Sequence, residues 1–157
     1  MEFMTLRQIF KQLFKASLLA AFDLSAQAQV MVMDGYVRAM PPSVPNSAAY
    51  FTLMNHGPAT KLVSVSSPAA DEAQLHTLIT ENELVKMRRL DSLELPEHGT
   101  VSLSETGNHI MLLGLKAPLQ EGQKIALTLT FADGQSLEIT LPVSKQGANA
   151  APHEHHH

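Results

Sequence analysis

Short runs of alternating apolar and polar residues recur at regular intervals after residue 29, with turn-forming residues between them. This period of two indicates strands that bury one face. Short strands at such spacing predict an all-β fold, a sandwich or Greek-key barrel in a single domain, rather than a parallel α/β sheet. The runs cover residues 30–39, 48–55, 61–66, 74–80, 84–90, 100–104, 109–115, 124–131 and 136–143.

The hairpin between the last two runs is the clearest. Asp133 and Gly134 separate two alternating stretches, and an Asp-Gly pair accepts the positive φ angles of a type I′ turn. The chain has 157 residues, which is enough for one hydrophobic core. Its net charge of −4, without a basic patch, argues against a nucleic-acid partner.

The first 28 residues differ in character from the rest. Basic residues precede the apolar run 16–22, and Ala26 and Ala28 form the small-x-small pattern of a signal-peptidase site. We therefore expect residues 1–28 to be a signal peptide, residues 29–144 to form the β domain, and residues 145–157 to be a flexible tail. An amphipathic helix is the alternative for the first segment. No later stretch is long and apolar enough to span a bilayer.

Four side chains at fixed spacing suggest a metal site. His76 is followed after ten residues by Met87, after twenty-one by His109, and after one by Met111. Two thioethers and two imidazoles form a soft, uncharged donor set that suits Cu(I) and is poor for zinc, calcium or magnesium. The chain has no cysteine, which excludes a blue-copper electron-transfer site because that site needs a thiolate.

Strand geometry places each half of this set. A loop at residues 81–82 predicts that His76 lies directly opposite Met87 on one face of a hairpin, within reach of a shared ion. His109 and Met111 are two residues apart on a strand and share a face. That the two pairs approach each other is a hypothesis. Taken singly, each residue would be read as ordinary packing or surface.

This spacing resembles the signature of the periplasmic copper-chaperone family called PCuAC, which reads His, ten residues, Met, twenty-one residues, His-x-Met. The similarity runs from about residue 35 to residue 143. Further matching segments are residues 37–39, 41–42, 49–51 with Asn55, 86–88 and 109–112. The family commonly has acidic residues where this chain has Gln74 and Thr77, and a threonine at the position of Met40.

The resemblance implies a cupredoxin-like β-sandwich or barrel that binds one Cu(I) near its surface through His76, Met87, His109 and Met111. It also implies a periplasmic copper chaperone that is not an enzyme. The expected acceptor is a subunit of cytochrome c oxidase, whose copper site it would help to assemble, or another copper chaperone. We expect a monomer.

The tail supplies a second metal hypothesis. His153, His155, His156 and His157 lie close together, and imidazole-rich segments favour Cu(II). A purification-tag remnant or an unstructured tail is the alternative.

Other readings remain open for the chain as a whole. A non-catalytic β-sandwich binding or adhesion module, with incidental His and Met, is preferred if the two ligand pairs lie far apart. No Ser-His-acid motif or phosphate-binding glycine loop is recognisable. Met31, Met33 and Met54 are expected to be core or edge packing, and His56 to lie in a surface loop.

Overall fold

The computed structural model describes residues 29–145, which form ten strands. The signal peptide predicted at 1–28 and nearly all of the predicted tail lie outside the described residues. Residues 29–145 contain no helix that is long and apolar enough to cross a membrane. The strands are β1 (Val30–Arg38), β2 (Ser47–Asn55), β3 (Thr60–Ser66), β4 (Ala70–Glu81), β5 (Leu84–Arg89), β6 (Leu93–Leu95), β7 (Thr100–Ser102), β8 (His109–Leu115), β9 (Lys124–Phe131) and β10 (Ser136–Ser144).

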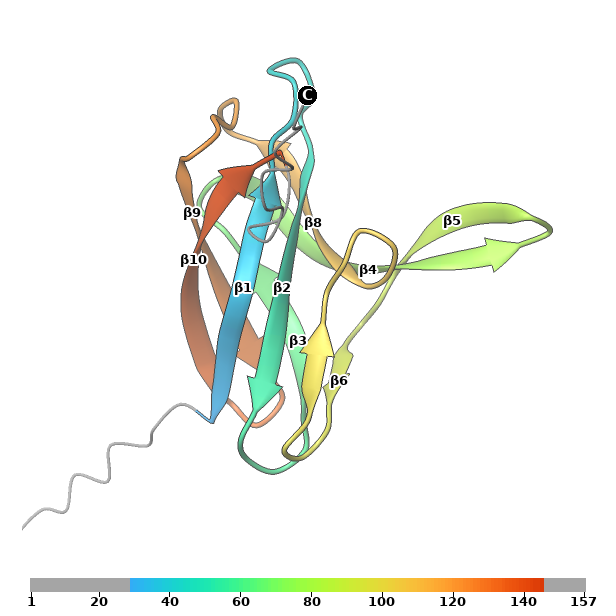
Figure 1. Ribbon diagram of the computed structural model, residues 1–157, viewed down its shortest axis with the longest axis vertical. Coiled ribbons are helices and arrows are strands. Elements are labelled where there is room, and N and C mark those ends of the chain that lie inside the picture. The colour runs from blue at the N-terminus through green and yellow to red at the C-terminus, as the bar shows by residue number, and fades with distance from the viewer. Residues whose placement is uncertain (1–28, 146–157) are drawn as a thin grey trace, which may run out of the picture.

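The strands lie in two facing layers (Figure 1). The first layer has the order β5-β4-β8-β2-β1, with β7 paired to β2, and the second has the order β10-β9-β3-β6. A short parallel pairing joins the layers, with Val37 opposite Val143 and Arg38 opposite Ser144. All other pairings are antiparallel.

The core lies between the layers and follows from the alternation in the sequence. On β2 the side chains of Ala49, Phe51 and Leu53 point inward and are at most 2% exposed. Leu127 and Leu129 on β9 close the core from the second layer. Aliphatic side chains from two inner sheet faces therefore pack together, as in a β-sandwich.

All nine predicted strands are confirmed, with small changes at their ends. The strand Leu93–Leu95 escaped prediction because three residues are too few to establish an alternating pattern. The predicted β9–β10 hairpin is also confirmed, but its turn type is wrong. Of Asp133 and Gly134, only Gly134 has a positive φ, of 89°. Residues 132–134 form a three-residue loop with this glycine in the left-handed position.

One hairpin extends away from the two layers (Figure 1). β4 pairs with β8 only as far as His76, and beyond that residue it pairs with β5 alone. Every residue of β5 is exposed. We call residues 77–88 the arm, and the candidate site lies where the arm meets the first layer.

Candidate metal centre

The pairing of β4 with β8 brings the two halves of the four-residue motif together. His76 lies directly opposite His109, and their ring centroids are 6.0 Å apart. Met111 lies opposite Gln74, two residues further along the same two strands and on the same face. The adhesion-module alternative was to be preferred if the two ligand pairs were far apart, whereas His76 of one pair lies beside His109 of the other.

The predicted register of the arm is wrong by two residues. Met87 lies opposite Leu78, and His76 lies opposite Arg89. The cause is the turn: Asn82 and Glu83 both have positive φ angles, of 51° and 66°, so the strands pair from Glu81 and Leu84 inward. A shift of two residues preserves the faces, so Met87 stays on the face of His76 as a diagonal neighbour.

The motif residues range from buried to exposed. His109 is 3% exposed and Met87 is 58% exposed, while His76 and Met111 are intermediate. Met87, His109 and Met111 line a pocket of about 290 Å³. His76 lies beside this pocket, next to the ring of His109. The site is therefore anchored in the sheet at one end and open to solvent at the other.

A backbone contact fixes the tautomer of His109. Its Nδ1 lies 3.0 Å from the carbonyl oxygen of Gly107. A carbonyl only accepts hydrogen bonds, so Nδ1 carries the proton and Nε2 keeps its lone pair. Metal-binding histidines are commonly oriented in this way through the second ring nitrogen.

His76 is oriented by a chain of side chains. The Gln74 amide donates to Glu72 at 2.6 Å, so its oxygen faces His76 and accepts from Nε2 at 2.8 Å. The Nδ1 of His76 therefore bears a lone pair, and it is buried without a hydrogen-bond partner. Burial lowers the pKa of His76, and His109 and Arg89 lower it further. His76 therefore remains neutral at neutral pH.

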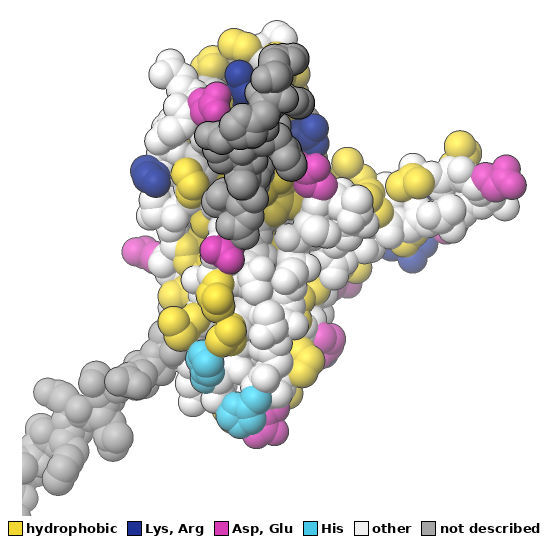
Figure 2. All heavy atoms as spheres, viewed as in Figure 1, with side chains coloured by type: hydrophobic (Ala, Val, Ile, Leu, Met, Phe, Trp, Pro, Cys, Tyr) yellow, Lys and Arg dark blue, Asp and Glu magenta, His cyan; other side chains and the backbone are white. Residues whose placement is uncertain are grey.

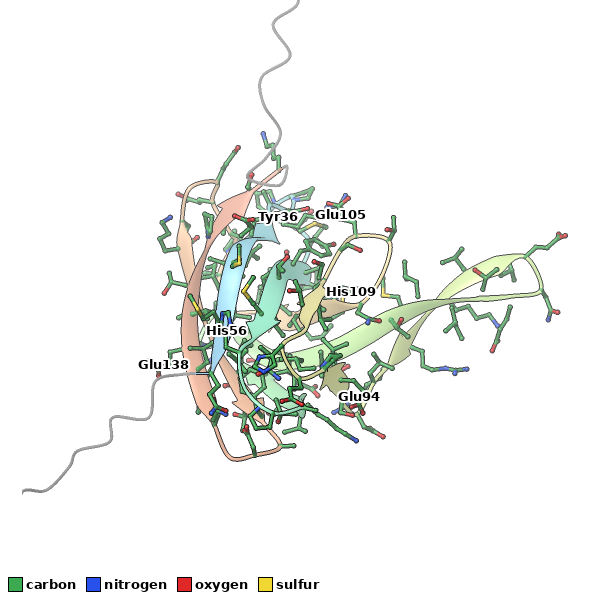
Figure 3. All side chains as sticks on the ribbon, turned by 60° about the horizontal axis from the view of Figure 1, so that its bottom comes forward. Tyr36, His56, Glu94, Glu105, His109 and Glu138 are labelled. Carbon is green, nitrogen blue, oxygen red and sulfur yellow. The ribbon has the colours of Figure 1, made fainter. Side chains whose placement is uncertain are left out.

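Sequence reasoning missed the aromatic and acidic side of the pocket. Tyr50 and Glu105 line it, and the ring centroids of Tyr50 and His109 are 6.3 Å apart. Tyr36 donates its hydroxyl to Glu105 at 2.8 Å, and Figure 3 labels these two side chains next to each other. Burial and Glu105 raise the pKa of Tyr36 to about 12, which keeps this donor protonated. The sequence pointed to one of these residues, because Tyr50 lies in the segment 49–51 that matches the PCuAC family.

Sulfur distinguishes this pocket chemically. Met40, which stands where the PCuAC family commonly has a threonine, lines it together with Met87 and Met111. Within residues 29–145, no three His, Asp or Glu side chains converge as a metal site. The three thioether sulfurs and the imidazole of His109 are donors that favour a soft metal ion.

Residues 30–143 match the family model described as "Putative lipoprotein LpqE-like". The chain belongs to the LpqE-like family. A relative of this LpqE-like chain is "Putative lipoprotein Lxx21020" from Leifsonia xyli subsp. xyli, which is 39% identical over 76% of this chain and 73% of the relative.

Several solved structures are similar to this LpqE-like chain. The solution structure of CuI-DR1885 from Deinococcus radiodurans is 34% identical, with a TM-score of 0.58, over 81% of this chain and 87% of that one. The copper-bound PCuAC domain from PmoF2 is 20% identical, with a TM-score of 0.65, over 77% and 97%. The predicted relationship to the PCuAC type and the all-β, cupredoxin-like fold class are confirmed.

Proposed function

We propose that this chain is an exported copper chaperone that binds one Cu(I) through His76, Met87, His109 and Met111. In this role it carries and transfers copper and catalyses no reaction. The observation that supports the proposal most directly is the pairing of His76 with His109. Met111 on β8 and Met87 on β5 lie on the two strands beside β4, each two residues away from direct opposition to His76.

The donor atoms fit Cu(I). Thioethers and neutral imidazoles are soft, uncharged ligands, and the lowered pKa of His76 favours the neutral ring that a metal requires. The partnerless Nδ1 of His76 is a buried acceptor, and a metal ion would relieve the cost of that unmet acceptor. The contact to Gly107 leaves Nε2 of His109 available in the same way.

Two comparisons add support. One similar structure is titled CuI-DR1885 and another is a copper-bound PCuAC domain. The relative named as a lipoprotein supports export, as does the predicted signal at residues 1–28, and we infer a periplasmic location. The acceptor suggested by the family resemblance is a cytochrome c oxidase subunit or a second copper chaperone.

The gradient of exposure suggests how copper would leave. Met87 is the most exposed donor and lies on an arm without neighbouring strands. A ligand of the acceptor protein can therefore replace Met87 first, while the buried His109 releases copper last. Thioethers and neutral imidazoles bind Cu(I) without the negative charge of a thiolate. Copper can therefore change ligands one at a time without the breaking of a thiolate–copper bond.

Competition with a Cu(I) chelator tests this proposal. Under reducing conditions the protein should withhold one equivalent of Cu(I) from the chelator. The double substitution His109→Ala with Met111→Ala should abolish this competition. His98→Ala is the matched control, because that imidazole is exposed and lies outside the pocket. The proposal is wrong if the wild-type protein does not compete or if the double variant competes equally well.

We also propose that His153, His155, His156 and His157 bind Cu(II), for which clustered imidazoles are suited. Deleting residues 153–157 should remove Cu(II) uptake, measured by electron paramagnetic resonance, and should spare Cu(I) competition. Survival of Cu(II) binding in the truncated protein would contradict this assignment.

A further inference from the structure

Three methionines gather on the outer face of β1 and β2, away from the pocket. Met31 is 51% exposed and Met33 is 42% exposed, while Met54 is partly exposed. Met31 and Met33 are therefore not core residues, and of the expected core or edge packing only the edge part fits them. Among the described residues, β1 pairs with β10 only at Val37 and Arg38, and its first part pairs with β2 alone. Figure 2 shows hydrophobic side chains over the lower part of β1, with histidines just below them.

The register brings these three side chains together. Met31 is directly opposite Met54, and Met33 is opposite Thr52, which makes Met33 a diagonal neighbour of Met54. Opposed Cβ atoms lie about 4.5–5.5 Å apart and diagonal ones about 7–8 Å. Methionine has three rotatable side-chain bonds and a polarizable sulfur, so three sulfurs at these separations can reach a common point.

The local backbone keeps this face outward. Val30 is 2% exposed and points into the core, while the register shift lies after Met33, where Asp34 has a positive φ. Met31 and Met33 therefore share one uninterrupted face. The ladder continues past the end of β2, where the amide of His56 donates to the carbonyl of Gln29 at 2.7 Å. Figure 3 labels His56 at this end of the two strands.

We propose that Met31, Met33 and Met54 form a second site for a soft monovalent metal ion, Cu(I) in the cell. Large exposed apolar side chains in a group commonly mark a functional surface, and three thioethers without a carboxylate select Cu(I) over hard divalent ions. With three donors instead of four, this site binds more weakly than the pocket and fills after it.

The second site is separate from the pocket but lies on the same face of the same layer. Met54 and Ala48 both point outward from β2, and Ala48 is opposite Met111. Six residues along a strand correspond to about 20 Å. Ions at the two places therefore do not share ligands.

Methyl NMR of the full chain, labelled with ¹³C at the methionine methyl groups, tests this proposal with Ag(I) as a redox-inert probe. The first equivalent should shift the methyl resonances of Met87 and Met111. The second equivalent should shift those of Met31, Met33 and Met54. The proposal is overturned if the three resonances stay in place after the second equivalent.

Matched variants separate this site from the pocket. Changing Met31, Met33 and Met54 together to Leu preserves side-chain volume and should remove only the second equivalent. Changing Met87 and Met111 to Leu should remove only the first. If Ag(I) shifts the resonances of Met31, Met33 and Met54 in the wild-type protein but not those of Met87 and Met111, the proposed function is refuted and this inference stands. Binding of the second equivalent by the triple variant would refute this inference.

Discussion

Gln74 holds His76 through one hydrogen bond and is itself held by Glu72 through another. The side chains of Gln74 and His76 lie on adjacent outward positions of β4, so the amide fixes the direction of the ring. Partners of this kind fix both ring orientation and tautomer, and their loss commonly lowers metal affinity by about 10–100-fold. The unpaired Nδ1 of His76 thus depends on a residue that is not itself a proposed ligand.

We predict that Gln74→Leu lowers Cu(I) affinity by about tenfold or more, because the ring loses its orienting acceptor. Gln74→Glu should retain or raise the affinity, since a carboxylate accepts the same hydrogen bond. Chelator competition measures both variants, and Gln120→Leu is the control at an exposed glutamine. Equal affinities for the Leu and Glu variants would contradict this role.

At this scale the sequence identified the four motif residues and flagged Gln74 as a departure from the family. It did not reveal the buried Nδ1 of His76 or the contact between His109 and Gly107. Both depend on ring orientation, which is set by neighbours in three dimensions and leaves no mark in the residue spacing.

The arm is the least supported element of the described chain. β5 has six exposed residues and pairs with β4 alone, and an isolated two-stranded hairpin is marginally stable in water. Its turn adds strain, because Glu83 has a φ of 66° and a left-handed conformation costs a non-glycine residue about 1–2 kcal/mol.

We predict that Glu83→Gly stabilises the arm against opening by about 1 kcal/mol, because glycine adopts this conformation without a clash. Asn-Gly is also the preferred sequence for such a two-residue turn. Amide hydrogen exchange in β5 should become slower. Glu83→Ala retains a Cβ atom and serves as the control, and equal exchange in the two variants would argue against turn strain.

The same turn explains why the strands of the arm were predicted and their register was not. The alternation of apolar and polar residues defined the strands on each side. The register depends on which two residues occupy the left-handed region, and glutamate is an unusual choice there. The face of Met87 was nevertheless correct, because a shift of two residues leaves alternation unchanged.

For the whole molecule, Asn55 links the two layers. It ends β2 in the first layer and is 1% exposed. Its amide nitrogen donates to the carbonyls of Pro58 at 2.9 Å and Pro96 at 3.1 Å, and its oxygen accepts from the amide of Gly57 at 3.0 Å. Pro96 directly follows β6 of the second layer, so one buried side chain joins both layers at this end.

We predict that Asn55→Ala lowers the free energy of unfolding by about 1–3 kcal/mol, because buried backbone groups lose their partners. Urea denaturation of the apo protein measures this change. Leu84→Ala, at a position 61% exposed, should stay within about 0.5 kcal/mol of the wild type. A neutral Asn55→Ala would show that water replaces these hydrogen bonds.

The fold class was predictable at this scale because the strand pattern is regular and the turns are well marked. The meeting of the two ligand pairs was not, because β5, β6 and β7 intervene between β4 and β8 in sequence. Strand order is decided by how the whole sheet closes over its core, and the spacing of His76 and His109 carries no information about it.

The arm should differ in mobility between the copper-bound and the copper-free protein. A copper ion bound by both Met87 and the ligands on β8 would link the arm to the first layer and reduce its motion. A protease that cleaves beside Asn82 should then nick the empty carrier faster than the loaded one, so that gel electrophoresis alone distinguishes the two forms.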